Sequence, residues 1–114
     1  MINRDAVIVR PKQPYINWAS QLDNSNVTPD QNDEPTIYLI PEYTDNSSAW
    51  TILEQIYNSI FDAELQAWHT ETSDWPAHRT FEMFRDWFDV VFISEILDLG
   101  SAPILDDATN HPID

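Results

Sequence analysis

Apolar residues change their spacing along the chain, and each spacing predicts a different kind of element. Short runs rich in β-branched residues predict three strands, at residues 6–9, at 36–40 and from residue 89 through 93 to an end between Ser94 and Leu99. Pro11 and Pro41 close the first two runs, because proline has no amide N–H to donate to a neighbouring strand. A spacing of about 3.6 residues predicts helices at residues 14–22 and 47–69, and a third in which Phe81, Phe84 and Phe88 share one face behind the capping residue Thr80.

The order of these elements predicts the fold class. Each amphipathic element needs a partner for its apolar side, which favours a small two-layer α+β domain with about three strands packed against helices, in the order β-α-β-α-α-β. We expect this single domain to span residues 1–99. Residues 23–35 predict a surface loop, and residues 100–114 predict a flexible, acidic C-terminal tail.

The composition excludes several classes of site. The chain has no cysteine, which excludes disulfides, thiolate metal ligands and cysteine nucleophiles. Its single glycine, Gly100, excludes a glycine-rich phosphate loop and a glycine-flanked serine nucleophile. No apolar run approaches the roughly 18 residues of a membrane span, and Asp5 stands where a secretory signal would need apolar residues. We therefore expect a cytoplasmic protein that does not contact a membrane.

The net charge of the chain indicates which class of partner it would bind. With 20 acidic and five basic residues, the net charge is −15. Direct binding of nucleic acid is disfavoured, because it needs Lys and Arg to neutralise phosphates. The expected partner is instead a basic protein, such as a nucleic-acid-binding protein. Acidic surfaces also serve solubility, so the charge by itself leaves a solvated surface as the alternative.

Separated carboxylates can also imitate the phosphates of a duplex, which presents one charge per roughly 1.7 Å of its axis. Trp75 lies outside the main helical periodicities, so an exposed ring there would be a partner contact, whereas Trp18, Trp50 and Trp68 fit the apolar stripes of helices. The candidate partner-binding residues recur through the predicted helical region: Glu54, Asp62, Glu64, Glu71, Asp74, Trp75, Glu82 and Asp86.

Two sets of residues could form a small-molecule or metal site. His69, Glu71, Asp74 and His78 offer nitrogen and oxygen ligands within one loop, which could converge on a metal or act as an acid/base set. Simple surface pairing of histidines with carboxylates is the alternative. We assign no catalytic residue and no cofactor from the sequence.

The basic residues Arg10 and Lys12 form the second set. Positive charges are rare in this chain, so these two could hold an anionic ligand beside Tyr15 and Trp18. The alternatives are pairing with the many carboxylates of the chain and a role for Pro11 to Pro14 as a rigid connector.

Several phrases of the sequence resemble a known group of proteins. They are Asn3 to Tyr15 followed by Trp18, Tyr38 to Tyr43, Trp68 to Thr70, Trp75-Pro76, and Arg79 to Asp89. In these phrases the chain resembles a group of small, acidic, uncharacterised bacterial proteins, over nearly its whole length apart from the acidic loop and the tail. The resemblance implies a bacterial source, and it implies no activity, ligand or catalytic residue.

Three hypotheses follow, and each predicts a different surface. The leading hypothesis is that the chain is a non-enzymatic, acidic protein that binds a macromolecule, and one version of it is that the chain imitates the charge of nucleic acid. This hypothesis predicts that carboxylates cover a continuous convex face. The alternative hypothesis is that the chain is a small-molecule or metal-binding domain, catalytic or not. It predicts a concave pocket around His69, Asp74 and His78 or around Arg10 and Lys12. A homodimer would show a large apolar patch instead, and the sequence does not fix the oligomeric state.

Overall fold

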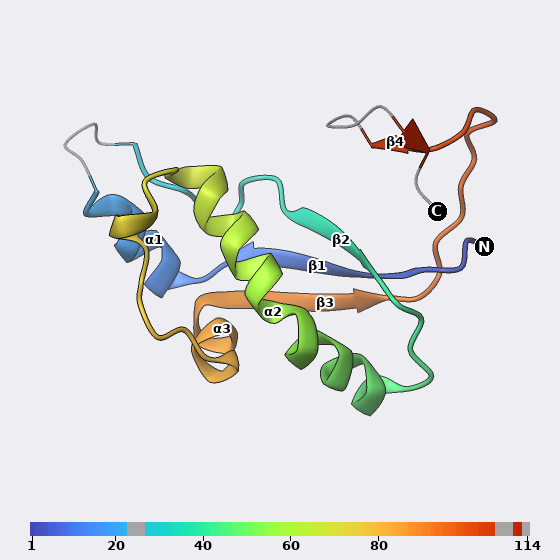
Figure 1. Ribbon diagram of the computed structural model, residues 1–114, viewed down its shortest axis with the longest axis horizontal. Coiled ribbons are helices and arrows are strands. Elements are labelled where there is room, and N and C mark those ends of the chain that lie inside the picture. The colour runs from blue at the N-terminus through green and yellow to red at the C-terminus, as the bar shows by residue number, and fades with distance from the viewer. Residues whose placement is uncertain (23–26, 107–110, 113–114) are drawn as a thin grey trace.

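The computed structural model of the chain describes residues 1–22, 27–106 and 111–112. Three strands form one antiparallel sheet in the order β2-β1-β3, with bounds β1 Asp5–Pro11, β2 Thr36–Ile40 and β3 Phe88–Ile93. The α-helices are α1 Gln13–Ser20, α2 Asn46–Trp68 and α3 Phe81–Trp87. In Figure 1, α2 crosses one face of the sheet diagonally, so that helix and sheet form two layers. The predicted α+β class and the order β-α-β-α-α-β are confirmed.

β1 is the central strand and pairs with both of its neighbours. Val7 and Val9 point toward the helices and are completely buried. Successive side chains of a strand point to opposite faces of the sheet, so Ala6, Ile8 and Arg10 point away from the helices. β1 places apolar side chains on both faces of the sheet, which is typical of a central strand.

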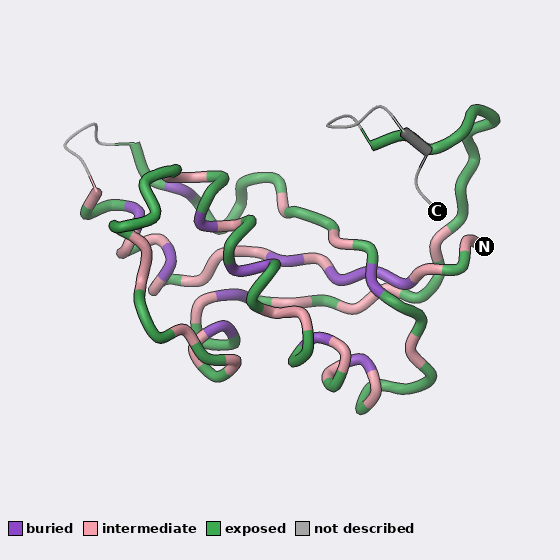
Figure 2. Tube along the Cα trace, in the orientation of Figure 1, coloured by how far each residue is buried: buried purple, intermediate pink, exposed green. Residues whose placement is uncertain are grey.

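α2 covers the sheet and begins at a capping box. The carboxylate of Asp45 accepts a hydrogen bond from the backbone N–H of Ser48 at 2.7 Å, and the hydroxyl of Ser48 accepts one from the backbone N–H of Asp45 at 3.0 Å. The buried residues of the helix pack toward the strands: Ala49, Leu53, Ile60, Phe61 and Leu65. Figure 2 shows that the buried positions concentrate in the strands and helices, whereas the segment after β3 is largely exposed.

α3 passes directly into β3, and this junction corrects one expectation. The side-chain hydroxyl of Thr80 caps α3 by accepting a hydrogen bond from the backbone N–H of Met83 at 3.1 Å. The prediction that Phe88 continues the helical face is wrong, because α3 ends at Trp87 and Phe88 begins β3. Phe88 is still 2% exposed, and its ring centroid lies 5.1 Å from that of Phe84. The ring therefore joins the core from a strand.

The segment after β3 leaves the sheet at the N-terminal end of the chain. The backbone N–H of Ile2 donates to the carbonyl oxygen of Ile96 at 3.1 Å. Farther along, β4 (Leu105–Asp106) pairs antiparallel with β5 (His111–Pro112), and Figure 1 shows β4 apart from the three-stranded sheet. The flexibility expected of the tail stays a prediction, and residues 107–110 and 113–114 lie outside the described residues.

Between these elements, a short 3-10 turn, η1 (Thr72–Asp74), interrupts the connection from α2 to α3. In the part of the chain that the structure describes, no helix combines the length and the apolar character needed to cross a membrane.

Candidate functional site

Two of the carboxylates expected to face a partner form ion pairs within the chain. Asp62 on α2 pairs with Arg79, which precedes α3. Oδ2 of Asp74 lies 2.9 Å from Nε2 of His69. Both acidic side chains remain about half exposed, at 52% and 51%, so these pairs stabilise the fold only slightly. A basic partner would nevertheless have to compete with an internal partner for each carboxylate.

Two further carboxylates serve local structure. Glu71 accepts a hydrogen bond from the hydroxyl of Ser73 at 3.0 Å and caps η1. Glu64 lies between α2 and β2, where its Oε2 accepts a hydrogen bond from the hydroxyl of Tyr38 at 2.5 Å. Burial, and after it the hydrogen bond to Glu64, raise the pKa of Tyr38 above its usual range. Glu64 is only partly exposed and lies between the two layers, and its role in binding a partner stays a prediction.

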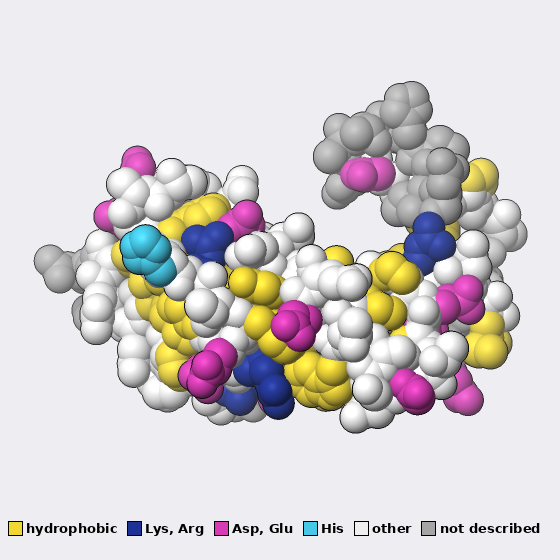
Figure 3. All heavy atoms as spheres, turned by 60° about the horizontal axis from the view of Figure 1, so that its bottom comes forward, with side chains coloured by type: hydrophobic (Ala, Val, Ile, Leu, Met, Phe, Trp, Pro, Cys, Tyr) yellow, Lys and Arg dark blue, Asp and Glu magenta, His cyan; other side chains and the backbone are white. Residues whose placement is uncertain are grey.

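The remaining three carboxylates, Glu54, Glu82 and Asp86, are exposed. On the face shown in Figure 3, acidic side chains lie apart from one another, with hydrophobic and uncharged side chains between them. A duplex presents phosphate charges at a close and regular spacing, roughly 1.7 Å along its axis. This face therefore offers no continuous carboxylate array that could imitate a duplex.

Trp75 turns back onto the body of the protein. Its indole N–H donates a hydrogen bond to the carbonyl oxygen of His69 at 2.8 Å, and its ring packs against the core cluster. The guanidinium carbon of Arg79 lies 5.9 Å from the centroid of the Trp75 ring. These contacts already occupy the ring, so they do not support Trp75 as an exposed partner contact.

The histidine loop brings together two of its four candidate ligands. His69 and Asp74 are in contact, and the indole N–H of Trp18 donates to the carbonyl oxygen of Asp74 at 3.0 Å. His78 lies in a bend with φ of 55°, the left-handed region. Within residues 1–22, 27–106 and 111–112, no three His, Asp or Glu side chains converge closely enough to hold a metal ion. His78 and Glu71 therefore do not complete a site with the His69–Asp74 pair.

Arg10 and Lys12 do not share a site with Tyr15 in the way the sequence suggested. Tyr15 is 5% exposed and belongs to the core. Nζ of Lys12 donates instead to the backbone carbonyl oxygen of Arg85 at 3.0 Å. Arg10 lies opposite Asp89 across the β1–β3 ladder, on the face of the sheet that points away from the helices. Arg10 and Lys12 nevertheless line one small hollow, together with Gln31, Asn32 and Asp89.

The face of the sheet that points away from the helices is apolar, and the sequence analysis missed it. Two rows of side chains cross all three strands, Ile37–Ile8–Val91 and Leu39–Ala6–Ile93, and we name these six residues the open sheet face. Three of the four residues on the outer strands are strongly exposed, with Ile37 at 61%, Leu39 at 45% and Val91 at 47%, whereas Ile93 is partly buried and the central Ala6 is 2% exposed. Contiguous exposed apolar surface of this kind commonly marks an interaction site.

A signal for this surface was present in the sequence. All three predicted strands are apolar at successive positions rather than at alternate ones, a pattern typical of strands that are covered on both faces. The helices of this chain cover only one face. The second apolar face is therefore left without a partner among the described elements.

Acidic residues flank the strands of the open sheet face in the sequence. Glu34 precedes β2, Glu42 follows β2 and Glu95 follows β3, and all three are exposed. Asp89 lies on the same face beside Arg10, in the row next to the apolar rows. The residues next to these strands in the sequence thus include more acidic than basic side chains, in keeping with the net charge of −15. Such a border favours a basic partner over an acidic one.

Comparison of the chain with protein-family models, with curated proteins and with solved structures finds no match. The resemblance to small acidic bacterial proteins stays a prediction. Any function is therefore inferred from the geometry and the charge of the chain itself.

Proposed function

We propose that this chain is a non-enzymatic, macromolecule-binding protein of the bacterial cytoplasm, and that its partner docks on the open sheet face. The observation that supports the proposal is the contrast between the two faces of one sheet. Val7 and Val9 are completely buried under the helices, whereas Ile37 and Val91, on the other face, are 61% and 47% exposed. A partner that covered that face would remove apolar surface from water, and each Å² of apolar surface buried stabilises the complex by about 25 cal/mol.

The proposed occupant is one amphipathic helix with lysines and arginines along both borders of its apolar stripe. Neighbouring strands lie about 4.8 Å apart, so three strands span roughly 10 Å. This width matches the diameter of a single helix, about 10 Å. Exposed Glu34, Glu42 and Glu95 would then face the basic borders of the helix.

Charge complementarity also distinguishes this partner from a second copy of the chain. A homodimer formed through the open sheet face would bring together two molecules that each carry a net charge of −15. A basic helix would instead be attracted to the same face, and like charges placed against each other oppose association. We therefore favour a basic partner over self-association.

The test uses a synthetic helical peptide of leucine and lysine, with the leucines on one face. A second peptide with the same leucines and with glutamate in place of lysine is the matched control. We expect the lysine peptide to bind saturably, to shift the NMR resonances of Ile8, Ile37 and Val91, and to bind more weakly at about 0.5 M salt than at about 0.05 M. The glutamate peptide is expected not to bind.

Two double variants locate the contact. Ile37→Ser with Val91→Ser removes apolar surface from the open sheet face, and we expect it to weaken binding of the lysine peptide at least about tenfold. Leu97→Ser with Leu99→Ser removes exposed apolar surface elsewhere and should leave binding unchanged. Equal losses in both variants would contradict the proposal. It would also fail if sedimentation showed a dimer that the first variant abolished, or if the glutamate peptide bound equally well.

A further inference from the structure

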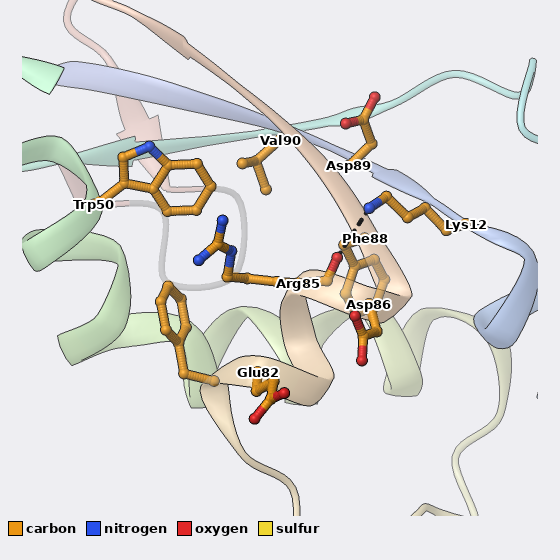
Figure 4. A pocket seen from close by; sticks show the side chains of 9 residues that line it. Lys12, Trp50, Glu82, Arg85, Asp86, Phe88, Asp89 and Val90 are labelled. Carbon is orange, nitrogen blue, oxygen red and sulfur yellow. Dashed lines mark hydrogen bonds between the residues drawn. The ribbon is translucent and has the colours of Figure 1, made fainter. Parts of the chain in front are cut away.

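A second candidate site lies on the helix-covered side of the sheet, where α2, α3 and β3 meet. A hollow of about 720 Å³ opens there, within the size range of small-molecule sites. Figure 4 shows the guanidinium of Arg85 next to the ring of Trp50 in this hollow, with Val90 of β3 close by. Val90 lines the hollow and Val91 belongs to the open sheet face, because successive residues of a strand point to opposite faces, and Asp89 borders both surfaces.

In this hollow, the guanidinium N–H groups of Arg85 have no hydrogen-bond partner in the described part of the chain. Its guanidinium carbon lies 4.6 Å from the centroid of the Trp50 ring. Stacking of this kind uses the flat face of the guanidinium and leaves its in-plane N–H groups available. Among the residues that the structure describes, Arg85 has no carboxylate within 4.0 Å. Glu82 lies three positions earlier on the same short helix, a spacing at which side chains can pair, but it does not pair with Arg85.

Lys12 and the apolar residues complete the surroundings of Arg85. Nζ of Lys12 donates to the carbonyl oxygen of Arg85 at 3.0 Å, which holds a second positive charge at the edge of the hollow. Two of the five basic residues of this acidic chain therefore line one hollow. The side chains of Trp50, Phe81 and Val90 are partly buried and supply apolar walls.

We propose that this hollow binds a small carboxylic acid with an apolar body, as its monovalent anion. The carboxylate would accept hydrogen bonds from the in-plane N–H groups of Arg85, because the guanidinium fork matches the geometry of a carboxylate. The apolar body would lie against Trp50, Phe81 and Val90. Lys12, at the edge, adds positive potential without having to contact the same oxygen atoms.

The acidic residues of the hollow favour a carboxylate over a phosphate. Glu82, Asp86 and Asp89 also line it, so its border carries more negative than positive charge. Figure 4 shows the carboxylates of Glu82 and Asp86 directed away from the facing pair of Trp50 and Arg85. A monovalent anion at Arg85 meets less repulsion from this border than a phosphate dianion would.

The test titrates the protein with phenylacetate and follows the indole N–H resonance of Trp50, assigned with the variant Trp50→Phe. Phenylacetamide, which has the same shape without the charge, is the matched ligand. We expect saturable shifts with phenylacetate and about tenfold weaker binding of phenylacetamide, because a hydrogen bond to a charged group is the stronger one. Inorganic phosphate is expected to bind more weakly than phenylacetate.

Variants test whether Arg85 holds the anion. Arg85→Gln should weaken phenylacetate binding at least about tenfold, and Arg85→Lys should give an intermediate value. Arg4→Gln makes the same change in net charge at the other end of β1 and should leave binding unchanged. The absence of saturable shifts, equal effects of Arg85→Gln and Arg4→Gln, or tighter binding of phosphate or phenylacetamide would overturn the proposal.

This proposal can fail independently of the proposed function. Ile37→Ser with Val91→Ser alters the open sheet face and should leave phenylacetate binding unchanged. Arg85→Gln should in turn leave binding of the lysine peptide unchanged.

Discussion

The hydroxyl of Tyr38 on β2 lies 2.5 Å from the carboxylate of Glu64 on α2, and both side chains are only partly accessible to water. The backbone carbonyl of the same glutamate accepts a second hydrogen bond, from the hydroxyl of Tyr15 on α1, at 2.6 Å. One residue of α2 thus joins the edge strand and the first helix. A carboxylate that the sequence suggested for binding a partner is part of the contact between the two layers.

This arrangement predicts a loss of stability at alkaline pH. Burial, and then the charge of Glu64, raise the pKa of Tyr15, and burial with the Glu64 hydrogen bond raises that of Tyr38, both above the ordinary value of 10.0. Above about pH 10 the unfolded chain loses these protons while the folded chain keeps them, so the free energy of unfolding falls as the pH rises. Each tyrosine contributes up to about 1.4 kcal/mol per pH unit.

Urea denaturation at a series of pH values measures this slope. Below pH 10 the stabilisation is complete, so the contribution of the tyrosines to the slope should appear only above that value. Tyr38→Phe removes one of the two titrating groups and should reduce the alkaline slope by about 1.4 kcal/mol per pH unit. An alkaline slope that is the same in the variant and in the natural sequence would show that Tyr38 does not keep its proton in the folded state.

The ion pair of Asp62 and Arg79 predicts unequal effects of removing its two members. Asp62→Asn should lower the free energy of unfolding by at most about 1 kcal/mol, because the carboxylate is half exposed. Arg79 is 19% exposed, and its guanidinium carbon lies 5.2 Å from the centroid of the Phe61 ring. It also donates to the carbonyl oxygen of Pro76 at 3.2 Å.

Arg79→Ala should therefore cost more, about 2–3 kcal/mol, through lost packing as well as lost charge. Urea denaturation of both variants measures the difference. Equal and small losses would indicate that Arg79 lies on the surface as an ordinary exposed ion-pair partner.

The elements of this fold could be predicted because their signals are local. β2 was placed correctly because Pro35 and Pro41 enclose a short apolar run, and Thr80 marks the start of α3. The one-residue error at Phe88 has the same local origin. An aromatic residue that fits the helical period can equally begin a strand, and only its register opposite Pro11 decides.

The candidate sites could not be predicted, because they depend on contacts between distant parts of the chain. Glu64 and Tyr38 are 26 positions apart, and nothing in the helical pattern distinguishes Glu64 from an exposed acid. The hollow at Arg85 combines Trp50 of α2, Arg85 of α3 and Lys12 from the connection between β1 and α1. The spacing of apolar residues also does not show how many helices cover each face of a sheet, because this depends on how the elements are arranged in space.

The histidine loop predicts that the protein does not gain stability from zinc. His69 contacts Asp74, and the residues described by the structure place no third ligand beside this pair. A metal ion that binds only the folded state would raise the melting temperature. We therefore expect neither zinc nor a chelator to change the melting temperature, measured by circular dichroism. A rise with zinc that His78→Ala abolished would contradict the observed geometry.

The aromatic core predicts a large loss of stability when Phe61 is replaced by alanine. Its side chain is completely buried, and its ring centroid lies 5.5 Å from that of Trp87 and 5.3 Å from that of Phe88. Phe61→Ala should lower the free energy of unfolding by about 3–5 kcal/mol, because it removes the ring and leaves a cavity. Phe81, at the border of the hollow, is only partly buried, so Phe81→Ala should cost distinctly less.

Urea denaturation of the two variants checks this order. An unchanged dependence of the free energy on urea concentration would show that both variants unfold from the same compact state. A domain of ordinary stability, about 5–15 kcal/mol, can still fold after the loss at Phe61, although with a much smaller margin. Similar losses at Phe61 and Phe81 would mean that the two rings are equally buried, and that the hollow beside Arg85 is closed in solution.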